Sequence, residues 1–126
     1  MTVARRDVPT CRVGERLGDV RERVTAAGWD ACVVVSDTGV VFGLLRSAEL
    51  ASDPNEPVER AMRPGPSTFR PHVDILEMAD YMVRKNLVNC PITTSDGRLM
   101  GLLLRDDAVA RAHELHDHAH HADGAG

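Results

Sequence analysis

Two acidic residues follow apolar hairpins at equivalent points of the chain. Glu49 lies six residues after the glycine of Gly43-Leu44-Leu45, and Asp107 lies six residues after the glycine of Gly101-Leu102-Leu103. An ionised carboxylate has two oxygens that can accept hydrogen bonds from a bound molecule. An acid in the first turn of a helix also favours the positive end of the helix dipole, so a purely structural role is equally open at Asp107. Glu49 has a comparable alternative, an exposed pair with Arg46 three residues before it.

The two acids belong to a stretch of sequence that occurs twice. Residues 33–50 and 89–109 both contain an apolar strand, a Ser-Asp pair, a glycine-containing turn, a second apolar strand and then an acid. The offset between the copies is about 59 residues before the turn and about 58 residues after it, so the first copy has one extra turn residue. A fixed period of this length indicates a duplicated supersecondary unit.

The elements that position Glu49 can be predicted from hydrophobic spacing. Residues 12–28 form an amphipathic helix that ends at Gly28. Its apolar positions are Leu17, Val20, Val24 and Ala27. Residues 31–45 favour two short strands around a turn, and a short helix should run from an N-cap at Ser47 to Ala51. Residues 53–66 contain four prolines and link the copies, with one helical turn at residues 58–62.

The second copy repeats this order and positions Asp107. A short strand is predicted at residues 67–70, then a helix, then a hairpin of residues 92–95 and 98–104. The apolar face of that helix consists of Ile75, Met78, Ala79, Met82 and Val83. A final helix should begin with Asp106 as its N-cap.

Each copy therefore has the predicted order β-α-β-β-α. The crossover requires a parallel pair and the turn an antiparallel hairpin, so the fold class is α+β, built from α/β-type repeats with mixed sheets. One unit is too small to bury its apolar face alone, so the two repeats should pack through their sheets with pseudo-two-fold symmetry. We assign residues 8–52 to the first repeat, 53–66 to a linker, 67–115 to the second repeat and 116–126 to a flexible, histidine-rich tail.

Composition argues against several classes of function. The net charge of −4 and the aromatic content of 3% give no basis for binding nucleic acid. We find neither an apolar run of roughly 20 residues for a membrane span nor a secretory signal. Three cysteines without a C-x-x-C pair fit a reducing, cytoplasmic environment, and Cys32 and Cys90 fit core positions within or beside apolar strands. The alanine- and arginine-rich composition suggests a bacterial source.

The layout resembles a tandem pair of cystathionine β-synthase (CBS) domains, also called a Bateman module. Four segments carry the resemblance: Met62-Arg63-Pro64, Asn89-Cys90-Pro91-Ile92, Ser95-Asp96-Gly97, and Gly101-Leu102-Leu103 followed by Asp107. The resemblance implies a protein that is not an enzyme and that pairs into homodimers. It also implies regulation of a separate protein partner, and binding of AMP, ADP, ATP or S-adenosylmethionine as a regulatory ligand rather than a required cofactor.

The resemblance also implies which residues would contact such a ligand. In the family an Asp six residues after the strand glycine accepts hydrogen bonds from the ribose hydroxyls, and a Ser or Thr three residues after it faces the phosphate. This chain keeps the acids Asp107 and Glu49 but has Leu104 and Arg46 at the hydroxyl positions. Arg46 can bind a phosphate more strongly than a serine, whereas Leu104 cannot hydrogen-bond one. The remaining candidates are Asp30, Ala31, Cys32, Asn89, Cys90 and Pro91 around the adenine, together with Arg63 and Arg105.

Two further hypotheses remain open. Because neither copy has a hydroxyl at the phosphate position, the protein is alternatively a structural or dimerisation module with degenerate ligand sites. The tail carries His116 and His120 four residues apart, a spacing that can chelate one metal on a helix face. These two are weak metal candidates because short histidine-rich tracts are only a compositional signal, so we predict no metal site.

Overall fold

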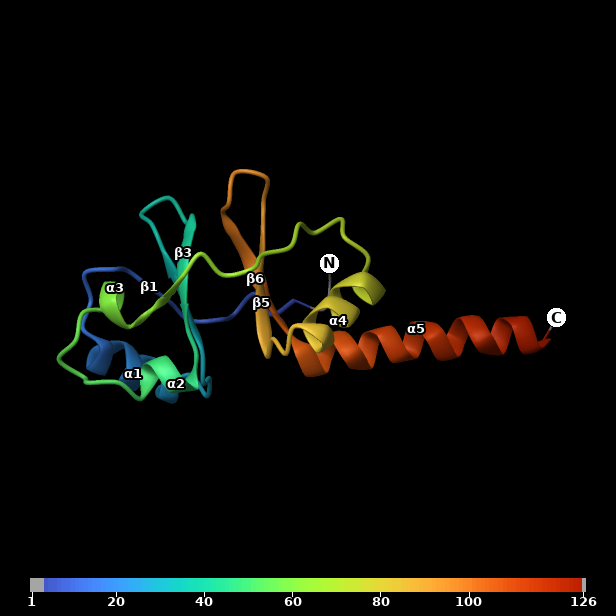
Figure 1. Cartoon of the computed structure of the whole chain (residues 1–126), viewed down its shortest axis with the longest axis horizontal. Helices are drawn as coiled ribbons and strands as arrows, with labels where there is room; N and C mark the ends of the chain where they lie inside the picture. The colour runs from blue at the N-terminus through green and yellow to red at the C-terminus, as the bar shows by residue number, and fades with distance from the viewer. Residues whose placement is uncertain (1–3, 126) are drawn as a thin grey trace.

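The computed structural model describes the backbone of residues 4–125 and the side chains of residues 4–115. Two similar halves lie against each other, each with strands on the inside and helices at the outer end (Figure 1). This arrangement confirms the α+β class and the two-repeat packing through the sheets.

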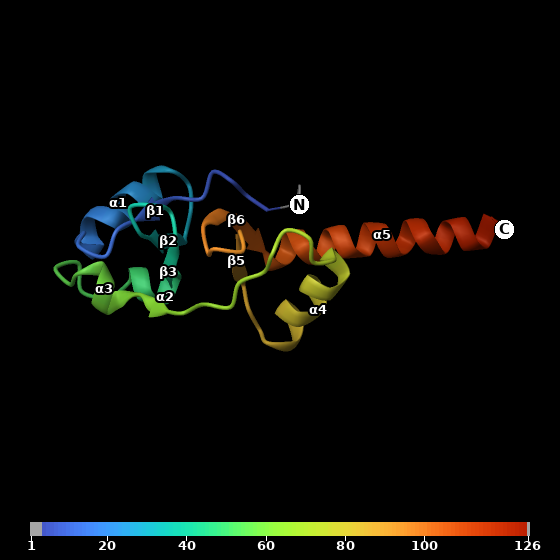
Figure 2. The ribbon, with the colours of Figure 1, turned by 90° about the horizontal axis from the view of Figure 1, so that it is seen from above.

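The first half is built on a sheet with strand order β1-β2-β3-β4. The strands are β1 (Thr10–Cys11), β2 (Cys32–Val35), β3 (Val41–Leu45) and β4 (Arg63–Pro64). β1 is parallel to β2, and the other neighbours are antiparallel. Helices α1 (Leu17–Ala26), α2 (Ser47–Leu50) and α3 (Val58–Ala61) pack on this sheet (Figure 2). Leu17, Leu45 and Val58 are fully buried in the cluster between them.

The second half has the same strand arrangement around one hairpin. β5 (Asn89–Thr93) and β6 (Leu99–Leu104) are antiparallel. Phe69 forms a parallel bridge with Ile92 at one edge, and Arg5 forms an antiparallel bridge with Leu102 at the other. Helices α4 (Ile75–Arg84) and α5 (Arg105–Ala125) cover the outer face, and α5 extends away from the body of the molecule (Figure 1).

The two halves exchange edge segments. β4 precedes the second half in sequence but pairs with β3 of the first, and Arg5 precedes the first half but pairs with β6 of the second. This exchange explains the glycine that precedes each Leu-Leu pair. A Cβ atom at Gly43 would lie 2.9 Å from the carbonyl oxygen of Arg63, and one at Gly101 would lie 3.0 Å from the carbonyl oxygen of Arg5. The crossing backbone therefore leaves no room for a side chain.

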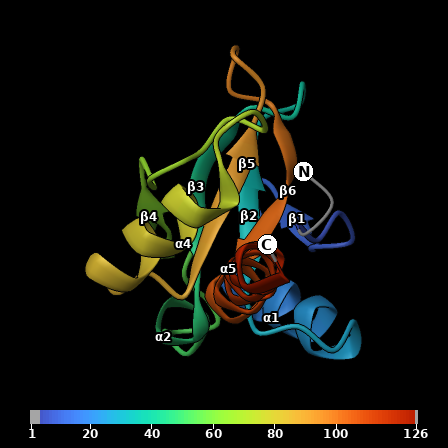
Figure 3. The same cartoon turned by 90° about the vertical axis from the view of Figure 1, so that its right-hand side faces the viewer.

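A shared apolar seam joins the halves. Val33 and Leu44 from the first half and Leu102 from the second are at most 1% exposed and lie in one cluster. The two hairpins project in the same direction (Figure 3) and are joined near their turns. There the amide of residue 41 donates to the carbonyl of residue 97 at 2.9 Å, and the amide of residue 99 donates to the carbonyl of residue 39 at 2.9 Å. Neither half thus buries its inner face without the other.

Several local predictions were wrong in detail. Ser47 is the first residue of α2 and Arg46 is its N-cap, while α5 already begins at Arg105, so Asp106 lies in its first turn. Ala27 is exposed because α1 ends at Ala26, and Val83 is 57% exposed because it lies on the outer side of α4. The predicted core positions of Cys32 and Cys90 are confirmed because both are buried, and Cys11 is buried as well.

Candidate ligand-binding site

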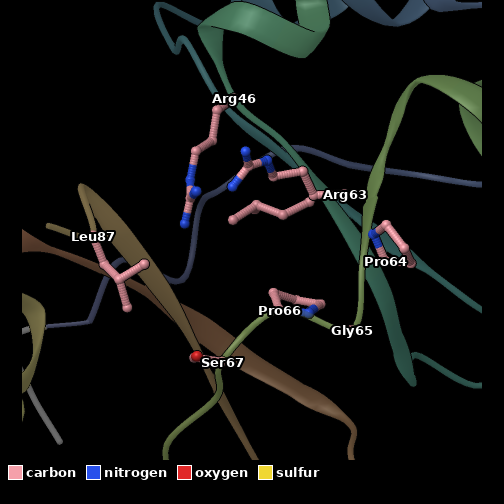
Figure 4. A pocket seen from close by; sticks show the side chains of 8 residues that line it. Arg46, Arg63, Pro64, Gly65, Pro66, Ser67 and Leu87 are labelled. Atoms are coloured by element: carbon pink, nitrogen blue, oxygen red, sulfur yellow. The ribbon is translucent and has the colours of Figure 1, made fainter. Parts of the chain in front are cut away.

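A cavity of about 200 Å³ lies at the junction of the two halves (Figure 4). Its walls come from the end of β3, from β4 and the segment after it, and from the turn before β5. The lining residues are Leu44, Arg46, Arg63, Pro64, Gly65, Pro66, Ser67 and Leu87. A flat apolar group can therefore contact leucine and proline side chains on one side, while two guanidinium groups face the same space.

A second hollow of about 160 Å³ also includes Arg46 in its wall. It is lined by Asp30, Arg46, Ser47, Ala48, Val88 and Asn89. The two hollows therefore adjoin at Arg46. Together they reach the lower end of the roughly 300–1,000 Å³ that is typical of small-molecule sites.

Arg46 connects the two halves directly. Its Nε donates a hydrogen bond to Oδ1 of Asn89 at 3.1 Å, and its Nη2 donates to the backbone oxygen of Asn89 at 3.4 Å. Arg46 lies three residues after Gly43, at the start of α2, and Asn89 is the first residue of β5. The guanidinium therefore crosses from one repeat to the other at the edge of the cavity.

Glu49 is held by the backbone rather than by the Arg46 side chain. Its Oε1 accepts a hydrogen bond from the backbone N–H of Arg46 at 2.9 Å, which is one half of a capping box. Its Oε2 lies 3.8 Å from Nε of Arg63, and the Glu49 side chain is only 14% exposed. The exposed Arg46–Glu49 pair considered from the sequence is thus wrong. One carboxylate oxygen caps α2 and the other lies toward Arg63.

Arg63 extends from β4 toward Arg46 at the cavity (Figure 4). Its side chain is 67% exposed, so its charge remains solvated. Cys90 fixes the opposite wall, because its Sγ donates a hydrogen bond to the carbonyl oxygen of Ser67 at 3.0 Å. Burial raises the pKa of the Cys90 thiol to about 12, so the thiol stays protonated as a donor.

The carboxylate of Asp107 is hydrogen-bonded to Arg5, a residue that the sequence analysis missed. Nε of Arg5 donates to Oδ2 of Asp107 at 2.9 Å, and Nη2 donates to Oδ1 at 3.3 Å. The Arg5 backbone is fixed by two 2.8 Å hydrogen bonds with Leu102. The duplication could have identified Arg5, because Ala4-Arg5 lies 58 residues before Met62-Arg63, which is the offset between the two copies. Leu104 packs against the central apolar cluster.

The other predicted site residues fall into two groups. Asp30 and Asn89 line the smaller hollow. Ala31, Cys32, Cys90 and Pro91 are buried in or beside the central strands, and Arg105 hydrogen-bonds Oδ1 of Asn86 at 3.0 Å rather than lining either hollow. The sequence analysis also missed Leu44, Gly65, Pro66, Ser67 and Leu87 as wall residues.

The side chains of His116 and His120 lie outside the described residues. Within the part of the chain that is described, no group of three His, Cys, Asp or Glu side chains could hold a metal ion. Within the same part, no helix is both long enough and apolar enough to cross a bilayer.

Two like halves that exchange edge segments, with a cavity at their junction, define a tandem-repeat module. Residues 58–114 match the model of the CBS domain family, and this part of the chain belongs to that family. With its similar first half, the chain has the fold of a tandem CBS pair. The matched segment begins at α3, although α3 packs on the core of the first half.

Solved structures with the same fold include three ligand complexes. The cytosolic domain of the Mg²⁺ channel MgtE in complex with ATP is 24% identical, with a TM-score of 0.77 over 83% of this chain and 45% of that one. CBSX2 in complex with AMP is 18% identical, with a TM-score of 0.79 over 89% and 92%. The CBS domain pair of protein MJ0100 in complex with 5'-methylthioadenosine and S-adenosyl-L-methionine is 15% identical, with a TM-score of 0.77 over 87% and 90%.

The chain spans about half the length of the MgtE domain it matches. None of the curated protein sequences compared with the chain is similar to it.

Proposed function

We propose that this protein is a regulatory module, not an enzyme, that binds an adenosine-containing ligand at the junction of its repeats and modulates a separate partner protein. The observation that carries the proposal is the cavity of about 200 Å³ that has apolar walls and is faced by both Arg46 and Arg63. Structures of the same fold hold ATP, AMP or S-adenosyl-L-methionine, which supports this class of ligand.

The chemistry of the cavity favours a phosphorylated ligand. Pro64, Pro66 and Leu87 offer apolar contacts to a base. Guanidinium groups bind phosphate oxygens through short, charge-assisted hydrogen bonds. S-adenosylmethionine carries a sulfonium and an ammonium group beside its single carboxylate, so it gains less from two nearby cations than a phosphate does. AMP, ADP or ATP should therefore bind more tightly than S-adenosylmethionine at this site.

The site in the first repeat is the better candidate of the two. The carboxylate of Asp107 in the second repeat is held by two hydrogen bonds from Arg5. The nearest Arg63–Glu49 distance is 3.8 Å, which is longer than a hydrogen bond. Less must therefore be broken for a ligand to bind beside Glu49.

Two observations favour the alternative of a structural or dimerisation module. Leu104 packs into the central cluster, and Asp107 is paired within the chain, both as expected of a degenerate site. Leu76, Val83 and Val109 leave an apolar groove between α4 and α5, which suits a homodimer. We propose a homodimer in the cytoplasm under either function.

Calorimetry and thermal melting of the whole chain with AMP, ADP, ATP and S-adenosylmethionine test the proposal. Ligand at 100 times its Kd should stabilise the fold by about 2.7 kcal/mol. Arg63→Ala should weaken nucleotide binding by about ten-fold, because a hydrogen bond to a charged group is lost. Arg60→Ala is the matched control, since Arg60 is exposed on α3 and is not part of the cavity wall. The absence of heat and of stabilisation at millimolar ligand would refute the proposal in favour of the structural module.

A further inference from the structure

Arg46 is a cation held across the seam by neutral oxygens. Both of its hydrogen bonds to the second repeat end on Asn89, at 3.1 Å on the amide oxygen and 3.4 Å on the backbone oxygen. Arg63, by comparison, faces the carboxylate of Glu49. A hydrogen bond from a guanidinium to a phosphate joins two opposite charges and is frequently bidentate, whereas the oxygens of Asn89 carry no net charge. A phosphate that enters the cavity is therefore a better partner for Arg46 than Asn89 is.

The position of Arg46 gives this competition a structural consequence. The side chain lines both the 200 Å³ cavity and the 160 Å³ hollow, so the two spaces adjoin at Arg46, and each is small for a nucleotide. If Arg46 turns away from Asn89, the two spaces can join. Asn89 itself is 4% exposed, so its amide oxygen needs a new hydrogen-bond donor when Arg46 leaves.

We infer that Arg46 is a latch that sets the preference for phosphorylated ligands, an inference that rests on the proposed function. Without ligand, Arg46 ties the start of α2 to the start of β5. When a phosphorylated adenosine ligand binds, its phosphate takes Arg46 from Asn89, the two adjoining spaces become one site, and one direct link between the repeats is lost. The share of the preference for AMP over adenosine that Arg46 contributes is then the difference between two competing partners of its guanidinium, separate from the contribution of Arg63.

The test compares AMP with adenosine by calorimetry on the whole chain. In the wild type, AMP binds more tightly than adenosine. Asn89→Ala removes the amide oxygen at 3.1 Å, the shorter of the two competing acceptors, and should raise the ratio of AMP affinity to adenosine affinity about three- to ten-fold, the range that one lost hydrogen bond supports. The ratio is compared because Asn89 lines the smaller hollow, so its loss can change contacts to the adenosine part that both ligands share. Arg46→Gln should lower this ratio, and Arg63 accounts for the preference that remains.

The double variant Arg46→Gln, Asn89→Ala separates a latch from a general effect of the substitution on the fold. If Asn89 acts only through Arg46, then Asn89→Ala no longer changes the ratio of AMP affinity to adenosine affinity once Arg46 is absent. Asn89→Asp is the opposite perturbation, because a carboxylate holds Arg46 more firmly and weakens AMP binding relative to adenosine. Asn89→Ser replaces Asn89→Ala if circular dichroism shows that the alanine variant is unfolded.

Three outcomes overturn the inference. A lower ratio of AMP affinity to adenosine affinity in Asn89→Ala, or an effect of Asn89→Ala on this ratio that persists in the double variant, refutes the latch while nucleotide binding by the wild type keeps the proposed function intact. An unchanged ratio in Arg46→Gln also refutes the latch alone. Failure of the wild type to bind either compound refutes the latch together with the proposed function.

Discussion

Replacement of Leu102 by alanine tests whether the two repeats share one core. Leu102 belongs to β6 of the second repeat, is 0% exposed, and lies in a cluster with Val33 and Leu44 of the first repeat. Its side chain thus fills space that belongs to both halves. The substitution should destabilise the first repeat although it changes only the second.

The size of the effect follows from burial. A fully buried leucine replaced by alanine costs about 2–5 kcal/mol, because the transfer free energy is lost and a cavity remains. A domain of 126 residues has a total stability of about 6–19 kcal/mol at 0.05–0.15 kcal/mol per residue. Leu102→Ala should therefore lower the urea midpoint by about 1–2.5 M for a slope near 2 kcal/mol per M.

The single tryptophan makes the assay specific for the first repeat. Trp29 precedes β2 and packs against both the first-half core and the shared seam, so its fluorescence reports unfolding of that half. Circular dichroism reports the helices of both halves. Met100→Ala is the control on the same strand, because Met100 is 38% exposed, and it should shift the midpoint far less.

In Leu102→Ala, fluorescence and circular dichroism should shift together to the same lower midpoint. A Trp29 transition at the wild-type midpoint, with a separate earlier transition by circular dichroism, would refute the reasoning. That result would mean that the repeats fold independently and that the seam contributes little.

Two further predictions concern single side chains. Arg5→Ala frees the carboxylate of Asp107, so calorimetry with AMP should show an additional, weaker binding event. The control Arg6→Ala, at an exposed position, should lack this event, and an unchanged isotherm in Arg5→Ala would contradict the prediction. Burial raises the pKa of Cys90 to about 12, whereas the thiol of the unfolded chain has a pKa of about 8.5. The protonated thiol therefore contributes its full stabilisation below pH 8.5, and this stabilisation is lost as the pH rises toward 12. The loss is about 2 kcal/mol at pH 10. The urea midpoint should therefore fall less between pH 7 and pH 10 in Cys90→Ala than in the wild type. An equal fall in both proteins would exclude this thiol as the cause.

Much of the fold was predictable because the signals are local. Helical and strand periodicities depend on residues a few positions apart, and the repeated Ser-Asp turn and Gly-Leu-Leu strand identified the duplication. One error was the predicted core position Val83, and most others fell at element ends, such as the cap at Arg46. At this cap the backbone N–H of Arg46 donates a hydrogen bond to the Glu49 side chain. Arg46 is therefore the N-cap, and Ser47 is the first residue of the helix.

The candidate site was only partly predictable because its partners are distant in sequence. Sequence reasoning selected Arg46, Glu49 and Asp107 from their positions in the repeat, but it did not identify what each side chain contacts. Arg46 bonds a residue 43 positions away, and Asp107 bonds one 102 positions away.

By itself the sequence determined that this protein consists of two copies of one unit, each ending in an acid, because periodicity and turn residues act over short distances. Only the tertiary structure decided that the copies exchange edge segments. That exchange places Arg5 on Asp107 and Arg63 near Glu49. The physical reason is that each inner face can be buried only against the other half, so the path of the chain across the seam determines which charges meet.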